Sequence, residues 1–282
     1  MSERTIEDVV TVERDGSVAV VWLDRPDARN AMAPEFWLGF PGVIDVLDTN
    51  DEVRVIVVAS KADDAFTVGL DLKAFGPALM SGSLDPNVTP PSPVAARKST
   101  YSLIKKMQQA FSALADSPKP VIAAVNGWCI GAGIELITAC DIRYAAEDAV
   151  FSVREAKLAI VADTGTLQRL PRIVEPGRAA ELIYTGRDFD AAEALEIGLV
   201  SRVLTSHDAV VEAAVDTAQQ IAANSPLAVQ GAKHILRKGD TLSIEEQLDH
   251  VALWGAAFVN SADLKEAITA FMEKRPPEFT GN

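Results

Sequence analysis

Basic residues are scarce in this chain. Its 282 residues include 26 Lys and Arg against 40 Asp and Glu, which gives a formal net charge of −14. A protein that binds along a nucleic-acid backbone needs clustered Lys and Arg to contact the phosphates, and no such cluster is present in the sequence. We therefore expect no nucleic-acid partner, and any anionic ligand must find a local basic patch.

Cysteine and histidine are also rare. Cys129 and Cys140 are too few and too widely spaced for a disulfide framework or a metal-binding set, and their apolar neighbours predict that both lie in the core. His207, His234 and His250 lie apart in the sequence without the spacing of metal ligands, and we interpret them as surface residues. The sequence predicts no metal site and no bound cofactor.

A long apolar run is missing too. The longest uncharged stretch, 120–134, is interrupted by Pro120, Asn126 and glycines, and it falls short of the roughly 20 apolar residues that span a bilayer. The amino terminus, MSERTIEDVV, has acids where a secretory signal has a basic region, and no apolar run follows it. These features predict no membrane segment and a cytoplasmic location.

The chain is long and apolar enough, at 48% hydrophobic residues, to bury a large core. Two alternating segments flank Asp15-Gly16, a pair that favours the positive φ angles of a tight hairpin turn. After the hairpin, the apolar spacing predicts helices over 34–48 and 101–114 and buried strands over 53–60 and 120–125. Strands and helices alternate, which is typical of an α/β core.

Two later segments differ from this pattern. Residues 81–100 are rich in Pro, Ser and Gly and predict a surface excursion. From about Ser206 the pattern is helical to the end, so we expect a core domain over 1–205 and a helical region over 206–282. The apolar faces of 209–223 and 249–259 are too extensive to leave in water, which predicts a trimer or hexamer.

Two glycine motifs follow predicted strands. In AFTVGLDL, Gly69 allows close approach of the backbone to a ligand, and the N–H of Leu70 can point outward, although a plain turn is the commoner explanation of such a motif taken alone. In NGWCIGAGIEL, Gly131 and Ala132 stand at a helix start, where unpaired N–H groups favour negative charge. The N–H groups of Leu70 and Ala132 together would make an oxyanion hole.

Three carboxylates lie near the second motif. Glu135 stands among apolar residues on the helix that Ala132 begins, and a solvated helix carboxylate is the simpler alternative. Glu155 has basic neighbours at Arg154 and Lys157, so an exposed ion pair would also explain it. Asp163 precedes a helical segment and could be an N-cap.

The segments LDRPDARNAM, AFTVGLDL, GAGIELITACDIRYAAEDAVF and AFMEKRPPEF, in that order, resemble the enoyl-CoA hydratase/isomerase (crotonase) superfamily over nearly the whole chain. The resemblance implies an α/β spiral of ββα units and a helical carboxyl-terminal region that builds trimers, usually paired into hexamers. It also implies a coenzyme A thioester substrate whose carbonyl oxygen is held by the N–H groups of Leu70 and Ala132. Ala132 replaces the more usual glycine and keeps the N–H.

The acidic positions of this chain resemble those of two different branches of that superfamily. Glu135 and Glu155 match the two glutamates with which enoyl-CoA hydratases hold and activate water. REAKLAIVADTGTLQRLP resembles the dienoyl-CoA isomerases, which have an aspartate at the position of Asp163 but usually Asp where Glu135 stands. We predict isomerisation of 3,5-dienoyl-CoA to 2,4-dienoyl-CoA in fatty-acid β-oxidation. Hydration of 2-trans-enoyl-CoA is the alternative, and a non-catalytic acyl-CoA-binding or RNA-binding hexamer is a third, which the net charge disfavours.

The isomerisation removes a proton from carbon 2 and adds one at carbon 6, so two groups are needed. We assign Glu155 to carbon 2 and Asp163 to carbon 6, with Glu135 polarising the dienoyl system and an apolar wall separating acid from base. The two glycine motifs supply further predicted substrate contacts: Val68, Gly69, Asp71, Leu72 and Gly131. Four cations are predicted to contact coenzyme A, although each could equally be a surface charge: Arg25, Arg29 and, from a neighbouring subunit, Lys274 and Arg275.

Overall fold

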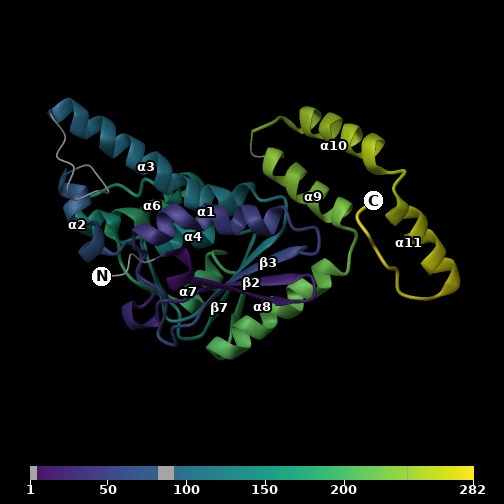
Figure 1. Cartoon of the computed structure of the whole chain (residues 1–282), viewed down its shortest axis with the longest axis horizontal. Coiled ribbons are helices and arrows are strands. Elements are labelled where there is room, and N and C mark those ends of the chain that lie inside the picture. Colours follow the sequence, from purple (N-terminus) through teal and green to yellow (C-terminus); the bar gives the residue numbers. More distant parts are fainter. Residues whose placement is uncertain (1–4, 82–91, 240) are drawn as a thin grey trace.

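Two β-sheets with helices packed around them form the main body of the protein (Figure 1). The structure, a computed structural model, describes residues 5–81, 92–239 and 241–282. The larger sheet has the order β1-β2-β3-β5-β7-β10, and the smaller has the order β4-β6-β8-β9. The strands are β1 (Val10–Asp15), β2 (Val18–Leu23), β3 (Val55–Ser60), β4 (Ala65–Thr67), β5 (Val121–Val125), β6 (Trp128–Ile130), β7 (Ile142–Ala146), β8 (Val150–Ser152), β9 (Phe189–Asp190) and β10 (Arg202–Leu204).

The strands of the larger sheet run parallel except at its first edge. From β2 to β10 each neighbouring pair is parallel, whereas β1 and β2 form an antiparallel hairpin. The central strands β3 and β5 consist almost wholly of Val, Ile and Ala and are buried on both faces, as parallel strands covered on two sides require. The two strands predicted over 53–60 and 120–125 are confirmed.

The hairpin turn is one residue away from the predicted position. Asp15 pairs with Val18 at the end of the ladder, so the two turn residues are Gly16 and Ser17 instead of Asp15 and Gly16. Gly16 has φ +58°, the conformation that glycine adopts without a steric penalty. The sequence identified the glycine correctly, and the register of the two strands decided which neighbour shares the turn.

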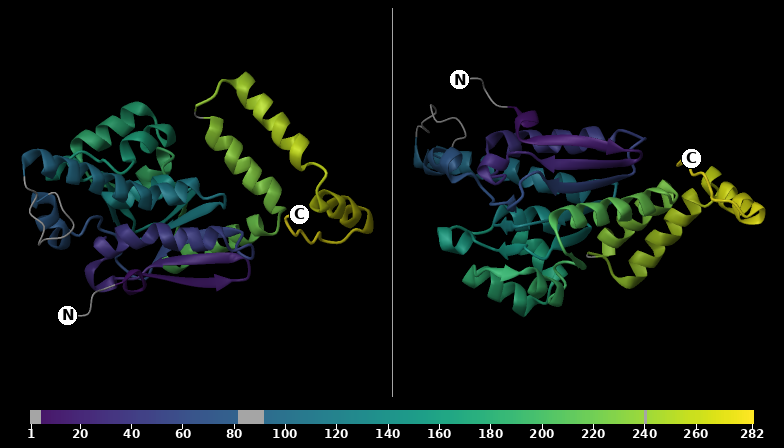
Figure 2. Two further views of the ribbon diagram at one scale, coloured as in Figure 1. Left: turned by 45° about the horizontal axis from the view of Figure 1, so that its top comes forward. Right: turned by 90° about the horizontal axis from the view of Figure 1, so that it is seen from below.

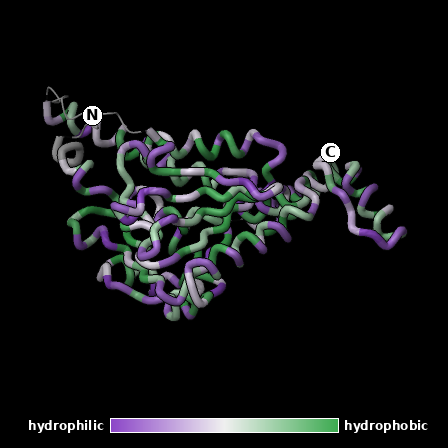
Figure 3. Tube along the Cα trace, turned by 60° about the horizontal axis from the view of Figure 1, so that its bottom comes forward, coloured by the Kyte–Doolittle hydropathy of each residue, from purple (hydrophilic) through white to green (hydrophobic). Residues whose placement is uncertain are grey.

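Successive strands alternate between the two sheets. β3, β5 and β7 lie in the larger sheet, and each is followed by a strand of the smaller sheet, β4, β6 or β8. Helices come after these strand pairs, so the chain winds as a spiral of ββα units, as predicted. The apolar core lies between the sheets and the helices that pack on them. Figure 3 shows the apolar residues concentrated on these inner segments.

Helices α1 (Pro34–Asp48) and α3 (Pro93–Asp116) lie next to each other along one side of the body. α1 matches the predicted range. α3 is longer than predicted because Ser92 caps its first turn and the helix continues through residues 93–100, which we expected in a surface excursion. The remaining helices of the body are α2 (Leu72–Ser81), α4 (Ala132–Ala139), α5 (Thr166–Ile173), α6 (Pro176–Thr185) and α7 (Ala191–Glu196). Residues 82–91 of that expected excursion lie outside the described residues.

The carboxyl-terminal helices divide into two groups. α8 (His207–Ala222) covers the outer face of the larger sheet with Val210, Ala214, Ala218 and Ala222. The apolar face predicted over 209–223 is therefore already covered within the chain. Helices α9 (Pro226–Gly239), α10 (Ile244–Phe258) and α11 (Ala262–Glu273) extend away from the body as an arm (Figures 1 and 2). The division at residue 206 stays a prediction.

The structure also settles the environment of the rare residues. Cys129 and Cys140 are buried and unpaired, as expected. His234 and His250, which we expected to lie apart, approach each other within 2.9 Å at their Nε2 atoms because α9 and α10 pack together. In the described ranges no group of three or more His, Cys, Asp or Glu could hold a metal ion, and no helix is long and apolar enough to cross a membrane.

Candidate active site

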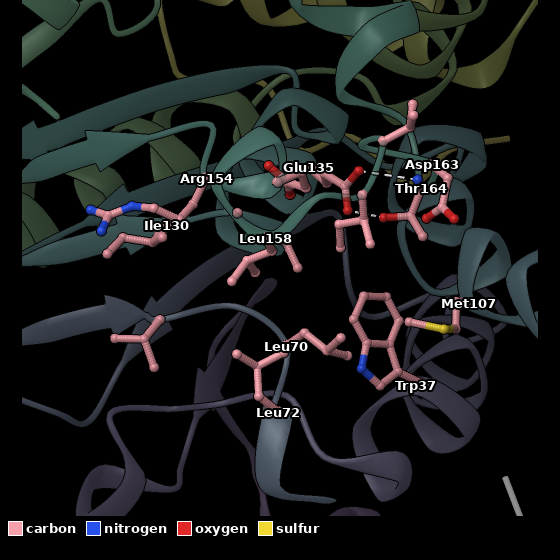
Figure 4. A pocket seen from close by; sticks show the side chains of 16 residues that line it. Trp37, Leu70, Leu72, Met107, Ile130, Glu135, Arg154, Leu158, Asp163 and Thr164 are labelled. Atoms are coloured by element: carbon pink, nitrogen blue, oxygen red, sulfur yellow. Dashed lines mark hydrogen bonds between the residues drawn. The ribbon is translucent and has the colours of Figure 1, made fainter. Parts of the chain in front are cut away.

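A cavity of about 260 Å³ lies where the smaller sheet meets α1, α4 and the turn before α5. Figure 4 shows its apolar side, with Trp37, Leu70 and Leu72, opposite Glu135 and Thr164. The residues that line it are Trp37, Val68, Leu70, Leu72, Met107, Ile130, Gly131, Ala132, Glu135, Arg154, Glu155, Leu158, Ile160, Val161, Asp163 and Thr164. All three carboxylates predicted from the sequence border this one cavity, as do both predicted oxyanion donors.

Close backbone contact brings the two glycine motifs together. Gly69 has φ +81°, and a Cβ there would lie 2.6 Å from the carbonyl oxygen of Ile130 and 3.2 Å from the nitrogen of Ala132. Met32 holds this segment on its other side, donating to the carbonyl of Gly69 at 2.7 Å. Among the described residues, the N–H groups of Leu70 and Ala132 have no hydrogen-bond acceptor. Two unpaired donors thus lie side by side at the cavity, the arrangement that an oxyanion hole requires.

Glu135 is not a solvated helix carboxylate. All eight residues of α4 are buried, and Glu135 is only 4% exposed. The backbone N–H of Thr164 donates to its Oε1 at 3.0 Å, and the hydroxyl of Thr164 donates to its Oε2 (Figure 4). Burial raises the pKa of Glu135, and the two hydrogen bonds from Thr164 oppose that rise.

Glu155 is not a surface ion-pair residue. It begins the short 3-10 helix η3 (Glu155–Leu158) and is 8% exposed, while its neighbour Arg154 forms an ion pair with Asp188 instead. Its Oε2 is buried without a hydrogen-bond partner in the described chain, and a Cβ on Gly131 would lie 3.3 Å from its Oε1. Burial, and then the negative charges of Glu135 and Asp163, raise the pKa of Glu155 to about 7. A carboxylate in this state accepts and releases protons near neutral pH.

Asp163 does not cap the helix that follows it. The N-cap position of α5 is taken by Gly165, and no side chain caps that helix. The backbone carbonyl of Asp163 accepts a hydrogen bond from the side chain of Gln108 at 2.7 Å, which ties this turn to α3. Asp163 is the exposed member of the three carboxylates, and partial burial of its carboxyl group raises its pKa.

The basic residues predicted to contact coenzyme A have partners within the chain. Arg25 is bonded to Asp71 at 2.7 Å, and Asp71 in turn caps the first turn of α2 through Lys73 and Ala74. Arg29 is exposed and pairs with Asp64 at 2.8 Å. None of these residues borders the cavity in the described chain. Their contact with substrate stays a prediction.

Lys274 is the C-cap of α11, and α11 lies on the arm that extends away from the main body in Figure 1. Its neighbour Arg275 is bonded to Glu266 and Glu273. Of the other predicted contacts, Val68, Leu72 and Gly131 border the cavity, whereas Gly69 shapes it from behind.

Sequence reasoning missed the residues that reach the cavity from distant elements. Trp37 comes from α1, where its indole N–H donates to the carbonyl of Met32 at 3.0 Å, and Met107 comes from α3. Leu158, Ile160 and Val161 supply exposed apolar surface at the mouth. The sequence suggested no role for Thr164 beyond its position next to Asp163. No local pattern marks Trp37 and Met107, because only the tertiary fold brings them to the cavity. Leu158, Ile160, Val161 and Thr164 instead belong to the same segment of the sequence as Glu155 and Asp163.

Comparison with known proteins agrees with this geometry. The model of the enoyl-CoA hydratase/isomerase family matches residues 13–86 and 93–282. A peroxisomal Δ(3,5)-Δ(2,4)-dienoyl-CoA isomerase of Arabidopsis thaliana is 43% identical over 99% of this chain and 98% of its own. A mitochondrial enzyme of the same name from Mus musculus is 38% identical over 98% of this chain and 82% of its own. The crystal structure of an enoyl-CoA hydratase from Bacillus anthracis superposes with a TM-score of 0.86, at 30% identity, over 97% of this chain and all of that one.

These relatives overturn one prediction from the sequence. We predicted a cytoplasmic location, but the relatives carry the words peroxisomal and mitochondrial in their names, so that prediction is wrong. Targeting to other compartments depends on short sequence motifs that receptors recognise, and neither net charge nor apolar content reveals such motifs.

Proposed function

The chain belongs to the enoyl-CoA hydratase/isomerase family, and from this we propose that it converts 3,5-dienoyl-CoA to 2,4-dienoyl-CoA. Two relatives that align over nearly its whole length carry the name of this activity. The observation that carries the proposal is the set of three carboxylates around one cavity beside two unpaired backbone donors. A reaction that moves a proton between distant carbons of a thioester needs these groups.

In the proposed mechanism the thioester oxygen accepts hydrogen bonds from the N–H groups of Leu70 and Ala132. Glu155, which lies beside Gly131 at this end of the cavity, takes a proton from carbon 2. The electron pair of the broken C–H bond forms the 2,3 double bond, the 3,4 pair becomes the 4,5 double bond, and the 5,6 pair takes a proton at carbon 6. Asp163 donates that proton. The negative charge of the intermediate spreads over the chain and the oxygen, where the two N–H groups stabilise it.

The mechanism requires Glu155 to be ionised and Asp163 to be protonated at the start. The pKa of Glu155, about 7, leaves part of it ionised at neutral pH while keeping it basic. Partial burial raises the pKa of Asp163, which moves this residue toward its protonated form. After one turnover Glu155 carries a proton and Asp163 has lost one. Asp163 is exposed and regains a proton from solvent, and Glu155 releases its proton before the next cycle.

Hydration of 2-trans-enoyl-CoA is the second candidate function. The observation that favours it is that Glu135 and Glu155 both border the cavity, so two carboxylates are available to hold a water molecule. Asp163 would then have no role. Its position on the same cavity, without any capping role for α5, favours the isomerase.

We also propose that the protein is a trimer or a hexamer and that it needs no cofactor beyond the coenzyme A of its substrate. The support for assembly is the apolar surface of the arm, where Leu253, Phe271 and Met272 are 70%, 85% and 77% exposed. Such a surface is typical of an interface between subunits. In an assembly of this kind Lys274 of one subunit would contact the coenzyme A bound to another.

The experiment that tests the proposed function compares two substrates on the same preparation. Turnover of 3,5-dienoyl-CoA is followed through the ultraviolet absorbance of the conjugated product, and turnover of 2-trans-enoyl-CoA through the loss of absorbance on hydration. We expect kcat/KM to be far larger for the diene. A larger value for hydration would instead establish the second candidate.

A further inference from the structure

Thr164 holds both oxygens of Glu135. Its backbone N–H donates to Oε1 at 3.0 Å and its hydroxyl donates to Oε2, so one residue satisfies the two ends of the carboxylate. Thr164 is 3% exposed and Glu135 is 4% exposed, so water does not compete for these bonds. In a buried environment, hydrogen bonds to an ionised group are stronger than those between neutral groups. The two bonds from Thr164 therefore fix the orientation of the Glu135 carboxylate and stabilise its negative charge.

Glu155 has the opposite environment. Its Oε2 has no hydrogen-bond partner in the described chain, although the residue is buried, at 8% exposed. Hydrogen bonds to the ionised form of a carboxylate lower its basicity, whereas burial without such bonds raises it. The two glutamates that line one cavity are therefore unlike: Glu135 is held and Glu155 is free to accept a proton.

The charged groups that face Glu135 come from three places. Glu155 approaches it from η3 and Asp163 from the turn before α5, and both are negative when ionised. Arg169 approaches from α5, where its Nη1 donates to the carbonyl of Thr164 at 3.4 Å and its guanidinium packs against Gly165. Arg169 thus supports the turn that carries Thr164 and offsets part of the negative charge.

We propose that Thr164 is a positioning residue that fixes Glu135 as a stationary negative charge, and that this makes the site favour isomerisation over hydration. The inference rests on the proposed function. Adding water requires a carboxylate that accepts a hydrogen bond from the water and then its proton, while the oxygen bonds to carbon 3 and carbon 2 gains a proton. Thr164 fills one acceptor position on each oxygen of Glu135 and lowers the basicity that this step needs. Glu155 remains as the base for carbon 2 and Asp163 as the acid for carbon 6, so Glu135 is the carboxylate that Thr164 withdraws from activating water.

The test uses Thr164→Val, which removes the hydroxyl with little change in volume, and Thr164→Ser, which retains it. Thr49→Val is the matched control, because the exposed hydroxyl of Thr49, which follows α1, bonds only to backbone carbonyls of that helix. Loss of a hydrogen bond to a charged group changes an equilibrium or rate constant about tenfold or more. We expect the ratio of hydration to isomerisation to rise about tenfold or more in Thr164→Val, while Thr164→Ser and Thr49→Val stay within about threefold of wild type.

An infrared titration of the carboxyl groups in the free protein supplies a second readout that needs no turnover. The band assigned to Glu135, identified by its loss in Glu135→Gln, should protonate at higher pH in Thr164→Val than in wild type, because the ionised form loses a donor. An equal fall of both activities with an unmoved titration would show that Thr164 is merely structural and would overturn the inference. Wild-type behaviour of Thr164→Val would overturn it as well.

Failure of the proposed function gives a different result. If the wild-type protein does not isomerise 3,5-dienoyl-CoA, the proposed function is refuted, whatever the variants do. The titration then decides the role of Thr164 by itself. A shift to higher pH in Thr164→Val supports the positioning of Glu135, and an unshifted band refutes it.

Discussion

Replacing Glu155 by Gln should abolish catalysis and at the same time stabilise the protein at neutral and alkaline pH. The substitution keeps the shape of the side chain and removes its basicity, so abstraction of the proton at carbon 2 loses its acceptor. General acid–base steps contribute on the order of 100- to 10,000-fold, and we expect a loss of that size. The assay is exchange of the carbon 2 protons of a bound thioester in heavy water, with turnover of 3,5-dienoyl-CoA beside it.

The magnitude of the stabilisation follows from the pKa of Glu155. Burial, then Glu135 and then Asp163, raise this pKa from 4.5 to about 7, so the folded protein binds more protons than the unfolded chain between these values. Stability therefore falls as the pH rises through this window. A rise of this size is equivalent to about 3 kcal/mol, since each pKa unit corresponds to about 1.4 kcal/mol. Glu155→Gln should gain this amount above about pH 7 and nothing below about pH 4.5.

Urea unfolding of both proteins at several pH values measures this difference. Glu147→Gln is the control, because Glu147 is an exposed glutamate that follows β7, and it should change neither activity nor stability. The acid limb of kcat/KM should lie near pH 7 in wild type, where Glu155 becomes ionised. Two results would refute the reasoning: a loss of proton exchange below about threefold, or a difference in unfolding free energy that does not grow with pH.

Three further outcomes are expected. Asp163→Asn should lose about 100-fold or more of diene isomerisation with unchanged binding of the thioester, because the proposed oxyanion donors are backbone groups of other residues and Asp163 does not cap α5. Normal isomerisation by this variant would contradict its role. Gly69→Ala should lower kcat about 100-fold, because the added methyl would meet the carbonyl of Ile130 at 2.6 Å and displace one oxyanion donor; steady-state kinetics with an unchanged kcat would exclude that role. Sedimentation velocity in dilute buffer should find a trimer or a hexamer, and a stable monomer at micromolar concentration would remove the proposed contribution of Lys274.

Local sequence predicted the parts of the fold that depend on short-range physics. The period of apolar residues located α1, and the runs of β-branched residues located β3 and β5, because these patterns follow directly from helix and strand geometry. The start of α3 was missed, since the Ser and Pro residues that suggest a loop also suit the first turn of a helix. The turn of the hairpin shifted by one residue because the pairing register, a long-range property, selects it.

The candidate site was predictable where its groups are adjacent in sequence to a recognisable motif. Local sequence placed Glu135 on a glycine-opened helix but left surface or capping roles open for Glu155 and Asp163, and the resemblance to the crotonase superfamily assigned all three to the site. Trp37 and Met107 were missed, because each is an ordinary apolar residue on a long helix and only the packing of α1 and α3 turns it toward the cavity. The internal partners of Arg25 and Arg29 were equally hidden. A cation has the same appearance in the sequence whether an aspartate neutralises it or not.

The contacts that bring the two proposed oxyanion donors together also depend on how the chain winds. Leu70 follows the strand of one turn of the spiral and Ala132 follows the strand of the next, so the two donors belong to successive turns. Backbone meets backbone between these turns: a Cβ on Gly127 would fall 2.2 Å from the carbonyl oxygen of Asp64, and one on Gly69 would fall 2.6 Å from that of Ile130. The distance between the donors is therefore set by the pitch of the spiral. A substitution that separates two turns would change the spacing of the two N–H donors and so lower the rate of catalysis, even at a position that does not contact the substrate.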